Sequence, residues 1–167
     1  MAKTGIGVPG AHLGHGHLKV SDLERSVAFY CDVVGMHEVT RFGRQAAFLA
    51  FDEYHHHLGL NTWESAGGTP PPPCHTGLYH MAFVYPDRAT LGQAIDRVFQ
   101  AGLELSGAAD HLVSEAVYLD DPDGNGVELY RDRPRADWPY DANGTLKMDN
   151  APLDVEALIA EGRAALS

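Results

Sequence analysis

Several features common in secreted and membrane proteins are missing from this chain of 167 residues. It has two cysteines, Cys31 and Cys74, which form neither a disulfide framework nor a CxxC metal pair. No run approaches the roughly 20 apolar residues of a membrane span. The opening MAKTGIGVPG lacks the apolar core of a signal peptide. These absences favour a cytoplasmic protein with free thiols.

Positive charge is scarce as well. Lysine and arginine total 12 against 23 acidic residues, which gives a formal net charge of -11. Nucleic acids and anionic membranes select basic patches, so we expect neither as a partner. The composition, 44% hydrophobic and 21% charged, is that of a globular protein. The length suits one domain or two small fused modules.

What the chain does have is an internal repeat. HGHLKVSD begins at His15 and HMAFVYPD begins at His80, and both read histidine, six residues, aspartate. Each stretch leads from a strand-like run into a run with helical spacing. The first predicted helix covers 21–35, with Ser21 and Glu24 as a capping box and a glycine stop. The second covers 87–102, with aspartate as its cap.

Three short strand-like runs follow each predicted helix. They lie near 36–42, 45–51 and 55–61 in the first half, and near 103–108, 113–120 and 126–131 in the second. DPDGNG, from Asp121 to Gly126, has the chemistry of a hairpin turn. Each half therefore reads βαβββ. The predicted fold class is α+β: two tandem βαβββ modules forming a curved mixed sheet around a metal site, plus a C-terminal helical tail.

The predicted boundaries follow from these patterns. Residues 1–135 form the paired domain, with module one at 11–64 and module two at 76–132. The proline-rich stretch 65–77 links the modules. Residues 136–167 form an extension whose run 152–166 reads as an amphipathic helix with Asp154 near its start. We expect that helix to pack on the body or on a partner subunit.

His15 and His80 are equivalent by the repeat, and each belongs to the first strand of its half. Glu128, inside GVELY, is poorly explained as a core residue without a partner. Two histidines and a carboxylate suit a divalent transition metal, and with Fe(II) they leave positions open. The alternative is structural: a lone strand histidine is more often a packing or surface residue, and a strand glutamate more often faces solvent.

These stretches carry a resemblance. GHGHLKVSDLERSVAFYCDVVGM, GLYHMAFVYPD and DPDGNGVELYRDRP resemble the two modules of the vicinal oxygen chelate superfamily, which includes glyoxalases, extradiol dioxygenases and bleomycin-binding proteins. The resemblance spans about residues 12–135 and is nearest to the catechol 2,3-dioxygenase-like members. It implies paired βαβββ modules and places the metal ligands on His15, His80 and Glu128.

The resemblance also gives meaning to HHLGLN. Extradiol dioxygenases carry an acid-base histidine on the last strand of this module, which selects His57; His55 is the alternative, because strand parity puts it on the same face and His56 on the other. A solvated edge is the plain alternative for all three. Tyr118, ten residues before Glu128, matches a tyrosine that hydrogen-bonds the bound catecholate in that group. His17, His55 and His111 are the expected substrate-binding residues, and a role in the turn is the alternative for His111.

The leading hypothesis is therefore an Fe(II)-dependent extradiol dioxygenase of aromatic catabolism, with a small aromatic diol and O2 as substrates. Mn, Zn and Ni are the alternative metals. A glyoxalase-like lyase or isomerase, with His57 as a fourth metal ligand, is the second hypothesis. A non-catalytic binding protein of the bleomycin type is the third. A homodimer is expected, because a second subunit would complete the outer wall of the pocket in a chain with only two modules.

Overall fold

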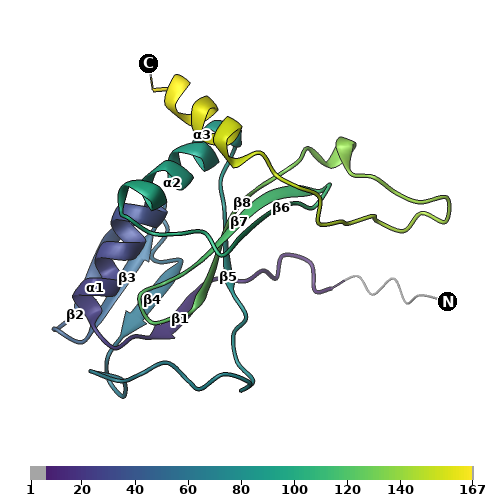
Figure 1. Ribbon diagram of the computed structural model, residues 1–167. Helices are drawn as coiled ribbons and strands as arrows, with labels where there is room; N and C mark the ends of the chain where they lie inside the picture. Colours follow the sequence, from purple (N-terminus) through teal and green to yellow (C-terminus); the bar gives the residue numbers. More distant parts are fainter. Residues whose placement is uncertain (1–6, 167) are drawn as a thin grey trace.

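The computed structural model describes residues 7–166 and contains two four-stranded mixed sheets (Figure 1). The strand orders are β1-β4-β3-β2 and β5-β8-β7-β6. The first sheet consists of Gly16–Lys19 (β1), His37–Phe42 (β2), Ala46–Ala50 (β3) and Leu58–Asn61 (β4). The second consists of Met81–Val84 (β5), Gly107–Asp110 (β6), Ser114–Asp120 (β7) and Gly126–Asp132 (β8). The α+β class and the βαβββ order of elements along each module are confirmed.

The single curved sheet expected from the sequence is instead two sheets. They meet at β1 and β5, which are the edge strands of their sheets. An added Cβ on Gly16 would lie 2.4 Å from Cε of Met81, so the two edges approach closely enough that a larger residue at 16 would displace the end of the Met81 side chain. The modules are therefore joined here by side-chain packing.

The first helix begins one residue later than its predicted capping box. Asp22 is the N-cap of α1 (Leu23–Ala28) and accepts from the backbone of Arg25. Ser21 was predicted to cap the helix, but its N–H and hydroxyl both donate to Asp123. The helix continues as a π-helical turn, η1 (Phe29–Val34), and ends at a glycine with a φ of 92°. The Ser21–Asp123 contact ties the DPDGNG turn of module two to module one.

The second helix, α2 (Arg88–Gln100), has the aspartate cap that the sequence predicts. Asp87 and Thr90 form a reciprocal capping box. Buried side chains from both modules pack into one core, and the fully buried members include Tyr30, Leu91, Ile95 and Leu129. The hydroxyl of Tyr30 donates to Asp121 at 2.9 Å, a second contact between the DPDGNG turn and module one.

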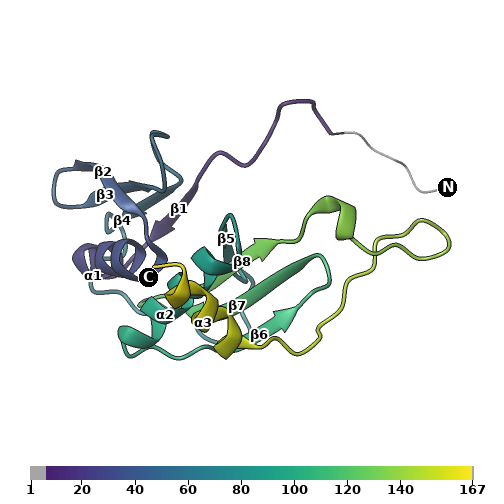
Figure 2. The same ribbon diagram turned by 90° about the horizontal axis from the view of Figure 1, so that it is seen from above.

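The extension contains a short 3-10 helix, η2 (Arg135–Asp137), and the predicted terminal helix, α3 (Val155–Ala164), capped by Asp154. Helix α3 packs on α2 at two glycines. A Cβ on Gly92 would lie 1.9 Å from the carbonyl oxygen of Leu158, and one on Gly162 would lie 2.6 Å from the backbone nitrogen of Gln93. The three helices follow one another along one side of the strands, and the loop 138–150 extends past the far end of β6 (Figures 1 and 2).

Strand β2 ends the first sheet, and all six of its residues are exposed. Its pairing with β3 shifts register between Glu38 and Thr40, which marks a bulge. Arg41 on this strand forms ion pairs with Glu38 and with Glu24 of α1. Within residues 7–166, no helix combines the length and apolarity needed to cross a lipid bilayer.

Candidate active site

Strand register places three of the predicted site residues on one face of the second sheet. Ala82 pairs with Glu128, and Glu128 pairs with Tyr118, so these side chains point the same way. His80 immediately precedes β5 and lies two residues before Ala82, which continues the alternation. Its predicted position on the strand is thus off by one residue.

The side chains on this face are in direct contact. Nε2 of His80 lies 2.9 Å from Oε2 of Glu128, and the Tyr118 hydroxyl lies 3.3 Å from Oε1 of the same carboxylate. The Glu128 side chain is only 12% exposed. Burial and the neighbouring carboxylate raise the pKa of Tyr118 to about 12, so the phenol keeps its proton through the neutral range.

His111 completes a series of contacts that begins at His80. Its Nε2 lies 2.6 Å from the Tyr118 hydroxyl. His111 stands in the tight connection between β6 and β7, where its backbone N–H donates to the Ser114 carbonyl. The next residue, Leu112, has a φ of 69°, a left-handed conformation that costs a bulky residue about 1–2 kcal/mol. Strain of this kind often accompanies functional positions.

A pocket of about 480 Å³ opens over these residues. His80, His111 and Tyr118 line it together with Ser106 and Asn150. Asn150 belongs to the C-terminal extension, and no catalytic role was predicted for the extension from the sequence. No sequence pattern marks Asn150 or Ser106 as pocket residues, because the chain fold alone brings them there.

The predicted ligand of module one, His15, lies in a different environment. It precedes β1 and its ring packs against His56, with 4.4 Å between ring centroids. His15 and His57 line a second pocket of about 550 Å³ with Phe51, Val84 and Tyr130, among others. This pocket includes residues of both modules. His15, Phe51 and His57 belong to module one, and Val84 and Tyr130, which pair across β5 and β8, belong to module two.

The three consecutive histidines do not belong to a strand, so the predicted parity is wrong. Strand β4 begins at Leu58, and residues 51–57 form an irregular bend. Nδ1 of His55 lies 2.8 Å from Nδ1 of His56, and it is His56 that contacts His15. Nδ1 of His57 accepts from the Phe51 backbone at 3.3 Å, and its side chain is 34% exposed and near Asp52. Because of this bend, the three histidine side chains point in different directions.

His17 shares the sheet face of His15 but packs away from both pockets. Its Nε2 lies 2.9 Å from the Asn61 amide nitrogen, and its ring lies beside Phe48 and Trp63. Gly59 leaves room for the ring, since a Cβ there would lie 2.9 Å from it. Partial burial and the adjacent His15 lower the pKa of His17. Its contacts are those of a packing residue.

Comparison with known proteins identifies the family. The family model of the Glyoxalase/Bleomycin resistance protein/Dioxygenase superfamily matches residues 12–129. The chain belongs to this superfamily. A protein named catechol-2,3-dioxygenase from Bacillus subtilis is 43% identical over 90% of this chain and 52% of its own length. Biphenyl-2,3-diol 1,2-dioxygenase 3 from Rhodococcus globerulus is 37% identical over 72% of this chain and 63% of its own length. The chain spans about half to two-thirds of the length of these relatives.

Solved structures show the same superfamily fold. A glyoxalase/dioxygenase from Nostoc punctiforme has a TM-score of 0.64 at 23% identity, covering 77% of this chain and 97% of that chain. A lactoylglutathione lyase from Agrobacterium tumefaciens has a TM-score of 0.58 at 23% identity, covering 74% and 96%. Both likenesses concern the fold alone.

Membership of the glyoxalase/dioxygenase superfamily implies a metal site, so the side chains that could bind a metal are compared with that expectation. His80 and Glu128 supply an imidazole and a carboxylate in contact, and Nδ1 of His80 is buried without a hydrogen-bond partner among the described residues. Residues 7–166 contain no assembled group of three or more histidine, cysteine, aspartate or glutamate side chains that would hold a metal. The chemistry of the pair fits a metal, and His15 stands apart from it.

Proposed function

We propose that this protein is an Fe(II)-dependent extradiol dioxygenase that cleaves the ring of a catechol-like substrate beside its two hydroxyl groups. The observation that supports it is the contact series from His80 through Glu128 and Tyr118 to His111 at a pocket, in a chain 43% identical to a protein named catechol-2,3-dioxygenase. The substrates would be a small aromatic diol and O2.

His80, Glu128 and His15 are the proposed iron ligands. Two of the three already touch, and His15 would leave its contact with His56 to join them. The chemistry that Fe(II) supplies when bound is polarisation of the diol oxygens and electron transfer to O2. The nearly buried Glu128 carboxylate also balances the positive charge of the ion.

Two further side chains have proposed roles in handling protons and in orienting the diol. His57 lines the pocket between the modules and keeps a partly exposed ring, so it is placed to exchange a proton with a ligand in that pocket. Tyr118 stays protonated and hydrogen-bonds the bound diol. We retain the homodimer as part of the proposal, with the second subunit covering the open side of the pocket.

The test is oxygen uptake by the full chain loaded with Fe(II) under anaerobic conditions and mixed with a panel of catechols. We expect uptake with a yellow ring-opened product on admitting air, and none with Glu128→Ala. Glu104→Ala, which removes an exposed carboxylate from another part of the chain, is the matched control. Absence of uptake across the panel, together with tightly bound Zn or Ni, would replace the proposal with lyase or isomerase chemistry.

A further inference from the structure

The C-terminal extension reaches the candidate site at one point. Asp110, at the end of β6, exchanges two backbone hydrogen bonds with Ala151, at 2.9 and 3.0 Å. This bridge places the carbonyl oxygen of Asp149 at 2.8 Å from Nδ1 of His111, and the Asp149 N–H at 3.4 Å from the His111 carbonyl. The family model ends at residue 129, so this contact involves a part of the chain beyond that match.

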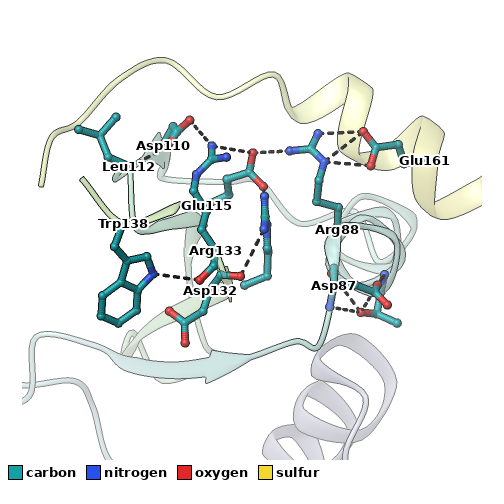
Figure 3. Close-up of polar contacts among 11 residues, drawn as sticks. Asp87, Arg88, Asp110, Leu112, Glu115, Asp132, Arg133, Trp138 and Glu161 are labelled. Atoms are coloured by element: carbon teal, nitrogen blue, oxygen red, sulfur yellow. Dashed lines mark hydrogen bonds and ion pairs between the residues drawn. The ribbon is translucent and has the colours of Figure 1, made fainter. Parts of the chain in front are cut away.

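On the β6 side of the bridge, Asp110 is held by a charged side chain (Figure 3). Arg133 donates to Asp110 at 2.6 Å, and it also contacts Glu115, which is 3% exposed. Arg88 of α2 links Glu115 to Glu161 of α3. The end of β6, the buried carboxylate and the terminal helix thus form one connected set of ion pairs. This set ties β6, the strand that pairs with Ala151, to the terminal helix of the extension.

The contact fixes the tautomer of His111. A carbonyl oxygen only accepts hydrogen bonds, so Nδ1 of His111 carries the proton that it donates to Asp149. In a neutral imidazole Nε2 is then an acceptor, and the group at 2.6 Å from it is the Tyr118 hydroxyl. The single proton of the Tyr118 hydroxyl lies between two neighbours, Nε2 of His111 at 2.6 Å and Oε1 of Glu128 at 3.3 Å.

We propose that residues 149–151 of the extension are a positioning element of the site: they hold the His111 ring as an Nδ1–H donor, so that Nε2 faces the Tyr118 hydroxyl at the ligand pocket. This inference deepens the proposed function and rests on it for the identity of the ligand. Asn150 lines the same pocket, and its amide makes no side-chain hydrogen bond within the described part of the chain.

The test is the protonation of the His111 ring in the full-length chain labelled with ¹⁵N. Long-range ¹H–¹⁵N spectra distinguish the two neutral tautomers at mildly alkaline pH, where an ordinary imidazole is neutral. His111→Gln identifies the signal by its loss. We expect the proton on Nδ1. A ring with the proton on Nε2 would overturn the inference without any further variant.

A pair of variants tests whether the extension causes this state. Ala151→Pro removes the N–H that donates to Asp110, whereas Ala151→Gly keeps it. We expect the proline variant to lose the single tautomer and show a mixture, and the glycine variant to match the parent chain. An unchanged ring in a folded Ala151→Pro protein would show that the extension does not set the tautomer. An Nδ1–H ring in a chain that consumes no oxygen would leave this inference standing and remove the dioxygenase proposal.

Discussion

Nε2 of His80 lies 2.9 Å from Oε2 of Glu128, although the two residues come from opposite ends of module two. The contact exists because β8 returns to pair with β5 in parallel, so that Ala82 and Glu128 stand side by side. A histidine and a carboxylate in contact at a pocket are the part of the proposed metal site that is already assembled.

Removing that carboxylate should remove the metal. We expect Glu128→Ala to lower the affinity for Fe(II) by at least about 100-fold, because even outer-shell partners of a metal cost about 10–100-fold when they are lost. Metal content after anaerobic loading and desalting is the measurement. Equal iron content in the variant and the parent chain would rule out Glu128 as a ligand.

His57 should matter for turnover and not for iron. Loss of an acid-base group costs about 100- to 10,000-fold in rate, so we expect a fall of that size in kcat for His57→Ala with unchanged iron content. His55→Ala is the matched control, since His55 is exposed in the same bend and neighbours His56. Iron content and oxygen uptake, measured on the same preparations, distinguish a loss of turnover from a loss of iron. If His55→Ala shows the larger loss, the acid-base role moves to that residue.

Helix α3 packs so closely on α2 that no space remains for a methyl group at Gly92. Because a Cβ on Gly92 would lie 1.9 Å from the Leu158 carbonyl, we expect Gly92→Ala to lower the free energy of unfolding by about 1–3 kcal/mol. Urea denaturation measures it. Gly77→Ala is the control, because a Cβ at Gly77 meets nothing within 4 Å. Similar midpoints for the two variants would mean that the helices are not packed this closely in solution.

Tyr85 should make the stability depend on alkaline pH. Burial raises the pKa of Tyr85 to about 12, and its hydroxyl donates to the Val34 carbonyl at 2.6 Å. In the unfolded chain a phenol ionises near its ordinary pKa of about 10. The unfolded state therefore loses this proton first, and the free energy of unfolding should fall between about pH 10 and pH 12 by about 2–3 kcal/mol.

Urea unfolding of the parent chain and Tyr85→Phe across that range checks the effect. The variant should be less stable near neutral pH by about 1 kcal/mol, for the lost hydrogen bond, and should lack this part of the alkaline decline. Parallel curves for the two proteins would show that Tyr85 does not carry it.

The sequence predicts the architecture well where the signal is local. The repeat, the Asp87 cap, the DPDGNG turn and the terminal helix all depend on neighbours in the chain, and all are confirmed. The register of the histidine run was wrong because the expected strand starts three residues later, at Leu58, and the bend before it has no period.

The long-range parts of the site could not be predicted in this way. Ser21 was expected to cap a helix, but a more distant acceptor, Asp123, takes its protons. The role of Asp149 depends on a backbone carbonyl, which every residue has, so its side chain gives no signal. Asn150 reaches the pocket because the extension turns back beside β6.

The exposed strand β2 has a consequence for how the protein behaves at high concentration. An open sheet edge is a template on which another chain can add a strand and begin to aggregate. Here the bulge between Glu38 and Thr40 interrupts the regular spacing of donors and acceptors, and Arg41 with its two acidic partners places charge along the edge. A copy approaching β2 would meet a kinked, charged border, which protects the end of the first sheet from growing further.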